Sequence, residues 1–150
     1  MDMYTYKTSI GNICIVESDG FITEINIDDS VKNTKETLLI KKTIKEINEY
    51  LEGRRKTFDI PLEPQGSEYF KKVWSELEKI PYGETRSYKE VAKNIGNEKA
   101  ARAVGLANHN NPIPIIIPCH RVIGKNNKLV GYALGLDLKQ KLLDLESKNV

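Results

Sequence analysis

The chain has 150 residues, of which 39% are hydrophobic and 29% are charged, and its formal net charge is +2. An ordinary apolar fraction with a small net charge excludes a chain that is disordered along its whole length. The longest apolar run, residues 113–119, is far shorter than the roughly 20 residues of a transmembrane helix. The opening residues lack the apolar stretch of a secretion signal, so we expect no membrane association.

The few cysteines and histidines limit the covalent and metal chemistry of the chain. Cys14 and Cys119 are too few for a disulfide framework in a protein of this size. The two histidines and two cysteines also lack the close paired spacing of a structural zinc site. We therefore expect free thiols in a reducing cytoplasm, with no metal and no cofactor.

Charge is distributed unevenly along the chain. Residues 1–63 carry nine Lys and Arg against twelve Asp and Glu, a net charge of −3. Residues 64–150 carry fourteen against nine, a net charge of +5. We expect two domains with this boundary, and the basic surplus of the second favours a polyanionic partner, although chance can produce a difference of this size.

The first domain is predicted to hold a small sheet and one helix. Apolar residues alternate between residues 4 and 27, and Asp19-Gly20 is a typical hairpin turn, so this stretch indicates antiparallel strands. Over residues 34–51 leucine and isoleucine recur at helical spacing. Residues 54–64 alternate again and contain prolines, which predicts an extended connection to the second domain.

The second domain is predicted to be mainly helical. One helix is expected over residues 67–79, and a second runs from Ser87 to residue 95, because Ser87 and Glu90 have the spacing of a capping box. A short turn with glycine then leads to a helix over residues 98–108. Two helices joined by such a turn are typical of a helix-turn-helix DNA-binding motif.

The rest of the second domain completes a winged-helix pattern. Residues 122–124 and 129–132 are predicted to pair as a small hairpin, the wing. A final helix is expected over residues 137–148, with Leu138, Leu142 and Leu145 facing inward.

The second helix of the helix-turn-helix pair has unusually small side chains. Alanine and glycine occupy five of its positions, and Arg102 is a long side chain in their midst: the five are Ala100, Ala101, Ala103, Gly105 and Ala107. A thin helix can approach a DNA minor groove closely and insert one long residue into the base stack. The alternative is that the alanine face packs against a neighbouring helix, and the pattern alone does not separate the two.

A cysteine with a histidine and an arginine after it marks the candidate chemistry. A cysteine attacks as its thiolate, which neighbouring cationic or histidine groups favour, so Cys119 beside His120 is a candidate nucleophile. Adjacent side chains diverge, so His120 would reach the sulfur through a water and would need an acceptor from the final helix, either Asp144 or Glu146. A buried, inert cysteine is the alternative.

The segment Pro118-Cys119-His120-Arg121-Val122, preceded by Asn111-Pro112-x-Pro114, resembles the active-site motif of the O6-alkylguanine-DNA alkyltransferases. Further stretches resemble that family in the same order: Phe58-x-x-Pro61-Leu62, Phe70-x-x-Val73-Trp74, Ile80-Pro81-Tyr82-Gly83-x-Thr85-x-Ser87-Tyr88 and Ala101-Arg102-Ala103-Val104-Gly105. Residues 1–49 match only in their order of strands and helix. The resemblance implies an α+β fold, with a ribonuclease-H-like first domain of a small antiparallel sheet plus a helix and a winged helix-turn-helix second domain.

The resemblance also implies a reaction and the residues that perform it. Cys119 matches the acceptor of the alkyl group, His120 the residue that deprotonates it through water, and Glu146 the carboxylate that orients this histidine. Asn111 matches the residue that bridges the helix-turn-helix to the active-site segment, and Tyr88 the pocket tyrosine that helps rotate the nucleotide and protonates the leaving guanine.

Other matched residues concern DNA and the flipped base. Arg102 matches the finger that fills the gap left by the base, on a helix where Ala101 and Gly105 permit close approach. The backbone of Val122 and Tyr132 match the pocket for the base. Ala133 departs from the family pattern because it has no side-chain hydroxyl for the leaving base, which leaves its backbone N–H for that role. The implied substrate is double-stranded DNA with O6-alkylguanine, and the implied product is a thioether, so we expect a monomer that reacts once.

Three other functions are kept as alternatives. A non-catalytic relative would bind the lesion without chemistry, but such relatives lack the cysteine that is present here at position 119. A winged-helix transcription regulator would tolerate loss of Cys119. A cysteine–histidine hydrolase would turn over without a lasting adduct.

Overall fold

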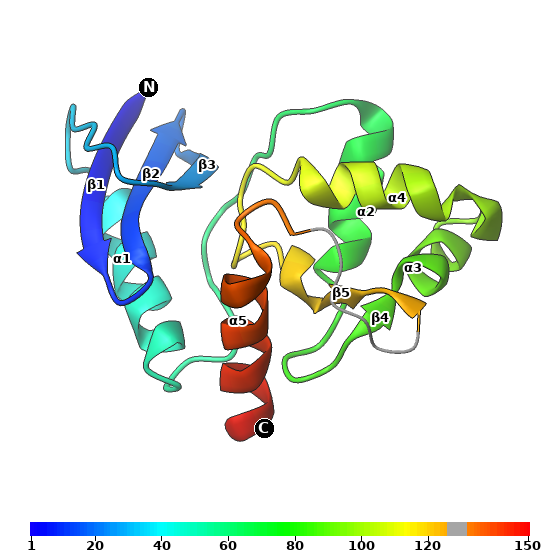
Figure 1. Ribbon diagram of the computed structural model, residues 1–150. Coiled ribbons are helices and arrows are strands. Elements are labelled where there is room, and N and C mark those ends of the chain that lie inside the picture. Colours follow the sequence, from blue (N-terminus) through cyan, green and yellow to red (C-terminus); the bar gives the residue numbers. More distant parts are fainter. Residues whose placement is uncertain (126–131) are drawn as a thin grey trace. The chain divides into compact units, whose positions relative to one another are not determined.

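The computed structural model describes residues 1–125 and 132–150 and divides the chain into two compact units, Met1–Gln65 and Gly66–Val150. Figure 1 shows the elements of each unit, coloured along the chain. The two units are described separately below.

The first unit has a three-stranded antiparallel sheet in the order β1-β2-β3, formed by β1 (Asp2–Thr8), β2 (Gly11–Ser18) and β3 (Phe21–Ile27). The β2–β3 turn is formed by Asp19 and Gly20, whose φ angles of 52° and 84° are typical of a two-residue hairpin loop. In the central strand, four consecutive residues from Ile13 are buried. The predicted strands and hairpin turn are therefore present.

One helix, α1 (Leu38–Leu51), packs against this sheet (Figure 1). It begins four residues later than the apolar spacing predicts, because Thr37 is its N-cap and accepts a hydrogen bond from the backbone N–H of Ile40. The residues before Thr37 bind the sheet edge instead: the N–H of Thr34 donates to the carbonyl of Met3 at 2.8 Å.

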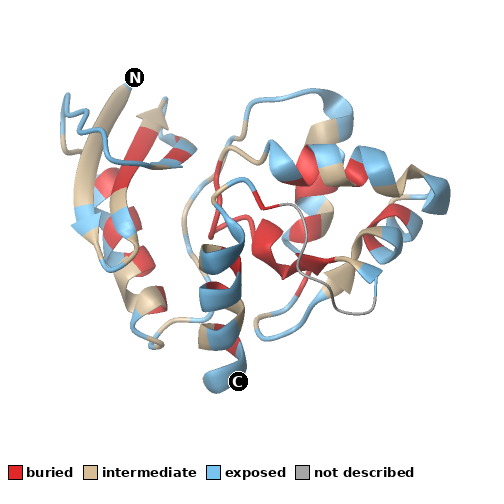
Figure 2. Cartoon of the chain, in the orientation of Figure 1, coloured by how far each residue is buried: buried red, intermediate tan, exposed pale blue. Residues whose placement is uncertain are grey.

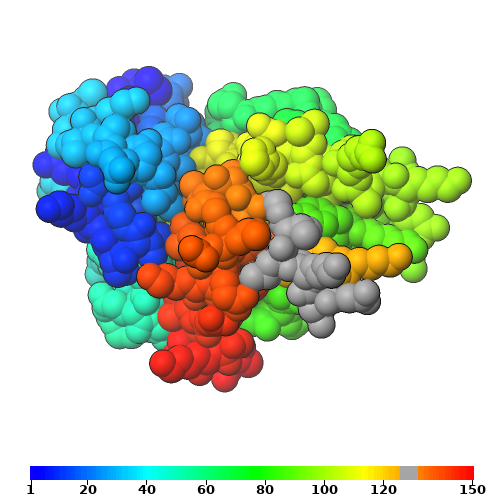
Figure 3. All heavy atoms as spheres, viewed as in Figure 1, coloured from blue at the N-terminus to red at the C-terminus, as the bar shows by residue number. Residues whose placement is uncertain are grey.

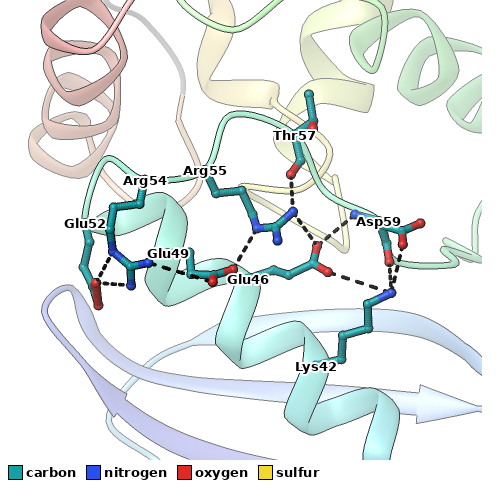
Figure 4. A network of polar contacts seen from close by, with 8 residues as sticks. All are labelled: Lys42, Glu46, Glu49, Glu52, Arg54, Arg55, Thr57 and Asp59. Carbon is teal, nitrogen blue, oxygen red and sulfur yellow. Dashed lines mark hydrogen bonds and ion pairs between the residues drawn. The ribbon is translucent and has the colours of Figure 1, made fainter.

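The connection after α1 is fastened to that helix by an ionic network (Figure 4). Glu46, which is only 3% exposed, accepts a hydrogen bond from the backbone N–H of Asp59 at 2.8 Å and lies 3.5 Å from the Arg55 guanidinium. Lys42 donates to the backbone carbonyl of Asp59 at 2.7 Å. Further along, Leu62 forms a parallel bridge with Ile22, so the extended connection also lies beside the sheet.

The second unit contains α2 (Glu68–Leu77), α3 (Tyr88–Asn94), α4 (Ala101–His109) and α5 (Leu136–Lys148). The capping box predicted at Ser87 and Glu90 is present at the start of α3. Between α3 and α4 the chain forms a short 3₁₀ turn, η1 (Glu98–Ala100), so the first turn of the predicted helix is tighter than an α-helix. Helices α3 and α4 pack together as the helix-turn-helix pair.

The core of this unit lies among α2, α3 and α4, where buried residues gather on the inner faces of the helices (Figure 2). Trp74 of α2 is 1% exposed, and its Nε1–H donates to the carbonyl of Ala107 in α4 at 2.8 Å. This bond fixes the end of α4 against α2.

The predicted wing is described only in part, because residues 126–131 lie outside the described residues. Its first residues form β5 (Val122–Ile123), which pairs in parallel with β4 (Arg86–Ser87). This strand pairing joins the start of α3 to the segment that follows the 3₁₀ turn at Cys119. Among the described residues, no helix is long and apolar enough to cross a membrane.

Candidate active site around Cys119

Cys119 lies at the start of a buried 3₁₀ turn, η2 (Cys119–Arg121), and is 4% exposed. The segment that leads to it, residues 113–118, forms turns and is buried from Ile113 onward, with the N–H of Ile117 donating to the carbonyl of Ile113 at 3.0 Å. Its Ile115 has a φ of 75°, a strained conformation for a β-branched side chain. At the turn itself, the N–H of Arg121 donates to the carbonyl of Pro118 at 3.0 Å. The cysteine is thus presented by a rigid, buried backbone.

Two asparagines fasten the end of α4 to this segment. Asn111 donates to the carbonyl of Ile117 at 2.8 Å and accepts from the N–H of Ile113 at 3.0 Å. Asn108, on the last turn of α4, is 2% exposed and donates to the carbonyl of Cys119 at 3.2 Å. The bridge predicted for Asn111 therefore has a second member, which the sequence analysis missed because a single asparagine in a helix has no distinctive pattern.

His120 is completely buried and contacts a carboxylate of α5. Its Nε2 lies 2.6 Å from Oε2 of Glu146, which is itself 1% exposed. The other candidate acceptor, Asp144, is exposed and accepts from Gln140. Burial lowers the pKa of His120, and the hydrogen bond to Glu146 opposes this shift. Because neutral imidazole can accept a proton, His120 is suited to act as a base.

Arg121 completes the arrangement around the carboxylate. Its Nε donates to Glu146 Oε1 at 2.8 Å and its Nη2 to Oε2 at 3.0 Å, a bidentate ion pair. Its Nη1 donates to the carbonyl of Ile80 at 2.7 Å, and the N–H of Gly83 donates to Glu146 Oε1 at 3.0 Å. From the sequence, Arg121 was expected only as a cationic neighbour of the cysteine, and its ion pair with Glu146 was not predicted.

Burial favours the protonated thiol of Cys119 and raises its pKa to about 11, while Asn111, Tyr132 and the positive charge of Lys139 act in the opposite direction. A nearby base is therefore needed to generate the nucleophilic thiolate.

Lys139 of α5 is a buried residue for which no role was predicted from the sequence. It is 0% exposed, and its Nζ donates to the carbonyl of Val122 at 2.6 Å. It also lies 5.9 Å from the centre of the Tyr132 ring. Tyr132 and Val122, predicted for the base pocket, are buried, whereas Ala133 is exposed.

Tyr88, the first residue of α3, is half-buried near the same cysteine. Burial raises its pKa, as does the proximity of negative charge on Cys119, and a hydrogen bond with Asn108 lowers it. Helix α4 passes beside this ring: a Cβ at Gly105 would lie 3.8 Å from the Tyr88 ring, an ordinary van der Waals contact. Tyr88, Cys119 and His120 thus belong to one cluster.

The outer face of α4 is exposed and carries Arg102, Ala103, Leu106 and His109. Figure 3 shows this helix, in yellow, at the surface of the second unit. Ala107 is buried and packs inward, and Ala101 is half-buried. One side of the helix therefore packs inside, as the alternative interpretation of the small residues predicted, and the other side is accessible.

Fold and site together define a helix-turn-helix protein with a buried cysteine, histidine and carboxylate at its centre. The chain belongs to the 6-O-methylguanine DNA methyltransferase family: the DNA binding domain of that family matches residues 68–148, and its ribonuclease-like domain matches residues 3–64. The predicted family and the predicted α+β fold are confirmed.

Individual relatives agree with this assignment. A methylated-DNA–protein-cysteine methyltransferase of Methanosarcina acetivorans is 54% identical over 123 residues, covering 82% of this chain and 78% of the relative. The constitutive enzyme of that name from Bacillus subtilis is 43% identical over 158 residues, covering 97% and 96%. The crystal structure of Mycobacterium tuberculosis OGT in complex with DNA matches with a TM-score of 0.90 at 38% identity, covering 100% of this chain and 95% of that one.

Proposed function

We propose that this protein repairs DNA by moving the alkyl group of O6-alkylguanine irreversibly to the sulfur of Cys119. The observation that carries the proposal is the buried turn on which Cys119 and His120 are adjacent, with His120 held by Glu146 at 2.6 Å. Family membership supplies the reaction class, since the curated relatives are named methylated-DNA–protein-cysteine methyltransferases.

The transfer is a displacement at the alkyl carbon. His120, whose Nε2–H donates to Glu146, takes the thiol proton at Nδ1 through a water. The Cys119 sulfur then forms a bond to the alkyl carbon as the bond from that carbon to O6 breaks, and the electron pair leaves with guanine. Tyr88 donates a proton to the departing base and recovers one from solvent. The products are guanine in DNA and a thioether on Cys119, so each molecule reacts once.

The alkylated base must leave the duplex before its O6 substituent can reach a buried sulfur. Flipping a base costs a few kcal/mol. The exposed face of α4 is suited to the minor groove, because Ala101 and Gly105 allow close approach and Arg102 is long enough to enter the base stack. Arg102 in the vacated position offsets part of the cost of flipping.

The flipped base is held by residues close to the nucleophile. We assign this pocket to the backbone of Val122, to Tyr132 and to the backbone N–H of Ala133. Asn111 keeps the active-site segment and the DNA-reading helix in register through its bonds to Ile117 and Ile113. We place DNA binding and chemistry in residues 64–150, which carry the net positive charge.

The working state is proposed to be a monomer in the cytoplasm, bound to double-stranded DNA that contains O6-alkylguanine. A thiol that must remain reduced until it reacts is suited to a reducing compartment.

Intact-protein mass spectrometry after incubation with duplex DNA that contains O6-methylguanine tests the function. One methyl group per chain is expected, located on Cys119 by peptide mapping. Cys119→Ala should gain none, whereas Cys14→Ala, the matched control, should gain one. DNA binding without a mass gain would instead identify a lesion-binding protein, and repeated turnover without an adduct would identify a hydrolase.

A further inference from the structure

The exposed face of α4 carries one large apolar side chain, which the proposed function leaves unused. Leu106 is 57% exposed, the highest value among the large apolar residues that the structure describes in helices α2 to α5. Arg102, Ala103, His109 and Asn110 are exposed with it. A single exposed leucine is ordinary on a protein surface, but surfaces that bind DNA are mostly polar and positively charged. A leucine in the middle of this face therefore points to a specific contact.

The backbone at Leu106 is held in place by several hydrogen bonds. Its carbonyl accepts from the N–H of Asn110 at 3.1 Å and from the side-chain amide of the same residue at 2.8 Å. The carbonyl of Ala107 accepts from the single tryptophan, in α2, at 2.8 Å, and Asn108 donates to the carbonyl of Cys119 at 3.2 Å. Leu106 thus projects from a helix end that is fastened both to the core and to the active-site turn.

Helical geometry places Leu106 one turn from Arg102 on the same face. Side chains four positions apart on a helix have Cβ atoms about 5–6 Å from each other. A DNA minor groove is about 6 Å wide, whereas an α-helix with ordinary side chains is about 10–12 Å across. Small residues such as Ala103 make α4 thinner, and Leu106 restores the width locally. A helix of this shape fits the groove only where the groove widens around the leucine.

We propose that Leu106 is an apolar wedge that enters the DNA minor groove one helical turn from Arg102 and keeps that groove open. Leucine is among the apolar side chains that minor-groove proteins insert to deform a duplex. The inference rests on the proposed function for the place of DNA on α4, and it adds a residue that selects DNA by the width of its groove. The partner of Leu106 is duplex DNA, and a second copy of this chain is the competing occupant.

The wedge predicts the affinity, the salt dependence and the sequence preference of DNA binding. Burial of the leucine in the groove is favourable, so its loss should weaken duplex binding about tenfold. Leucine carries no charge, so the salt dependence of binding should stay as in the wild type. A-tracts are stiff and have a narrow minor groove, whereas TA steps deform easily. The wild type should therefore prefer a duplex rich in TA steps, and this preference should shrink without the wedge.

The test is fluorescence anisotropy with two unmodified duplexes, one rich in TA steps and one with an A-tract, at several salt concentrations. Leu106→Ala removes the wedge, and Leu106→Met keeps an apolar side chain of similar size. Leu38→Ala is the matched control, because Leu38 is an exposed leucine of α1 in the first unit. We expect weaker binding and a smaller preference for Leu106→Ala, and values near those of the wild type for the other two. Circular dichroism establishes that the variants are folded.

Three results would overturn the wedge. The first is wild-type affinity of Leu106→Ala for both duplexes. The second is a loss of affinity with a reduced salt dependence, since phosphate contacts would then have been lost instead. The third is self-association of the wild type that Leu106→Ala abolishes in analytical ultracentrifugation, because the leucine would then contact a second copy. None of these measurements requires methyl transfer. A wild type that binds with the expected dependence on Leu106, yet accepts no methyl group from O6-methylguanine DNA, would overturn the proposed function and leave the wedge supported.

Discussion

Replacing Glu146 with glutamine should damage stability and chemistry together. The carboxylate is 1% exposed and accepts from the Gly83 N–H and Arg121 Nε at Oε1 and from Arg121 Nη2 at Oε2, where His120 Nε2 also lies 2.6 Å away. The glutamine amide has an NH₂ group in place of one oxygen. Whichever way it is oriented, that NH₂ group faces a nitrogen donor of Arg121, and Arg121 loses its counter-charge.

The expected loss of stability follows from removing one partner of a buried ion pair. Leaving a buried charge uncompensated costs about 3–5 kcal/mol. A domain of ordinary stability, about 5–15 kcal/mol, remains folded but weakened. Loss of an oriented general base should slow the methyl transfer about 10²–10⁴-fold.

Urea unfolding followed by Trp74 fluorescence measures the stability of the second unit, since Trp74 is the single tryptophan of the chain. Asp144→Asn is the control, because Asp144 is an exposed acid on the same helix and its loss should change the stability by less than about 0.5 kcal/mol. The double variant Arg121→Met with Glu146→Gln should be less destabilised than the sum of the single variants, because neither charge is left alone. If Glu146→Gln unfolded within about 0.5 kcal/mol of the wild type, the buried ion pair would not have the energetic role argued above.

Four further predictions concern other parts of the second unit. Trp74→Phe should lower the free energy of unfolding, measured by circular dichroism, by about 1–3 kcal/mol, because the carbonyl of Ala107 loses its buried donor. Ser87→Ala should lower it by about 1 kcal/mol through loss of the cap of α3, and Ser87→Thr should restore most of this loss. Arg102→Ala should slow methyl transfer from duplex DNA much more than transfer from the free modified base, and equal slowing would contradict the finger role. Because the pKa of His120 is lowered from 6.5, the unfolded chain binds more protons, so stability should decrease as pH falls below 6.5, and His120→Gln should flatten that dependence in urea titrations at several pH values.

Local signals in the sequence predicted the elements well where the structure depends on neighbouring residues. The turn at Asp19 and Gly20 needs only two residues with positive φ, and the cap of α3 needs only Ser87 and Glu90, so both were visible. The start of α1 depends on the cap at Thr37 and also on Thr34, which binds Met3 more than thirty residues away and so lies outside the helix. The pairing of Val122–Ile123 with Arg86–Ser87 is likewise long-range. The sequence pattern predicted instead that residues 122–124 pair with residues 129–132, which are close to them in the chain.

The candidate site was predicted mainly through its resemblance to a known family. Spacing alone left Asp144 and Glu146 as equal partners of His120, and the structure separates them because only Glu146 contacts the ring. Asn108 and Lys139 were missed for one physical reason. Helical periodicity assigns polar residues to the solvent side, whereas these two are buried by the hydrogen bonds they make to backbone carbonyls.

Helix α5 supplies Glu146 and Lys139, the groups whose charges act on His120 and Cys119, and it follows the nucleophile in the chain. During synthesis on the ribosome, Cys119 therefore emerges before its acid–base partners. Until α5 has been made and has docked, the sulfur has neither an oriented base nor a neighbouring ammonium group. On the proposed function, a cysteine that is consumed by a single reaction thus gains its full reactivity only at a late stage of folding, when the helix proposed to read DNA has already been synthesised.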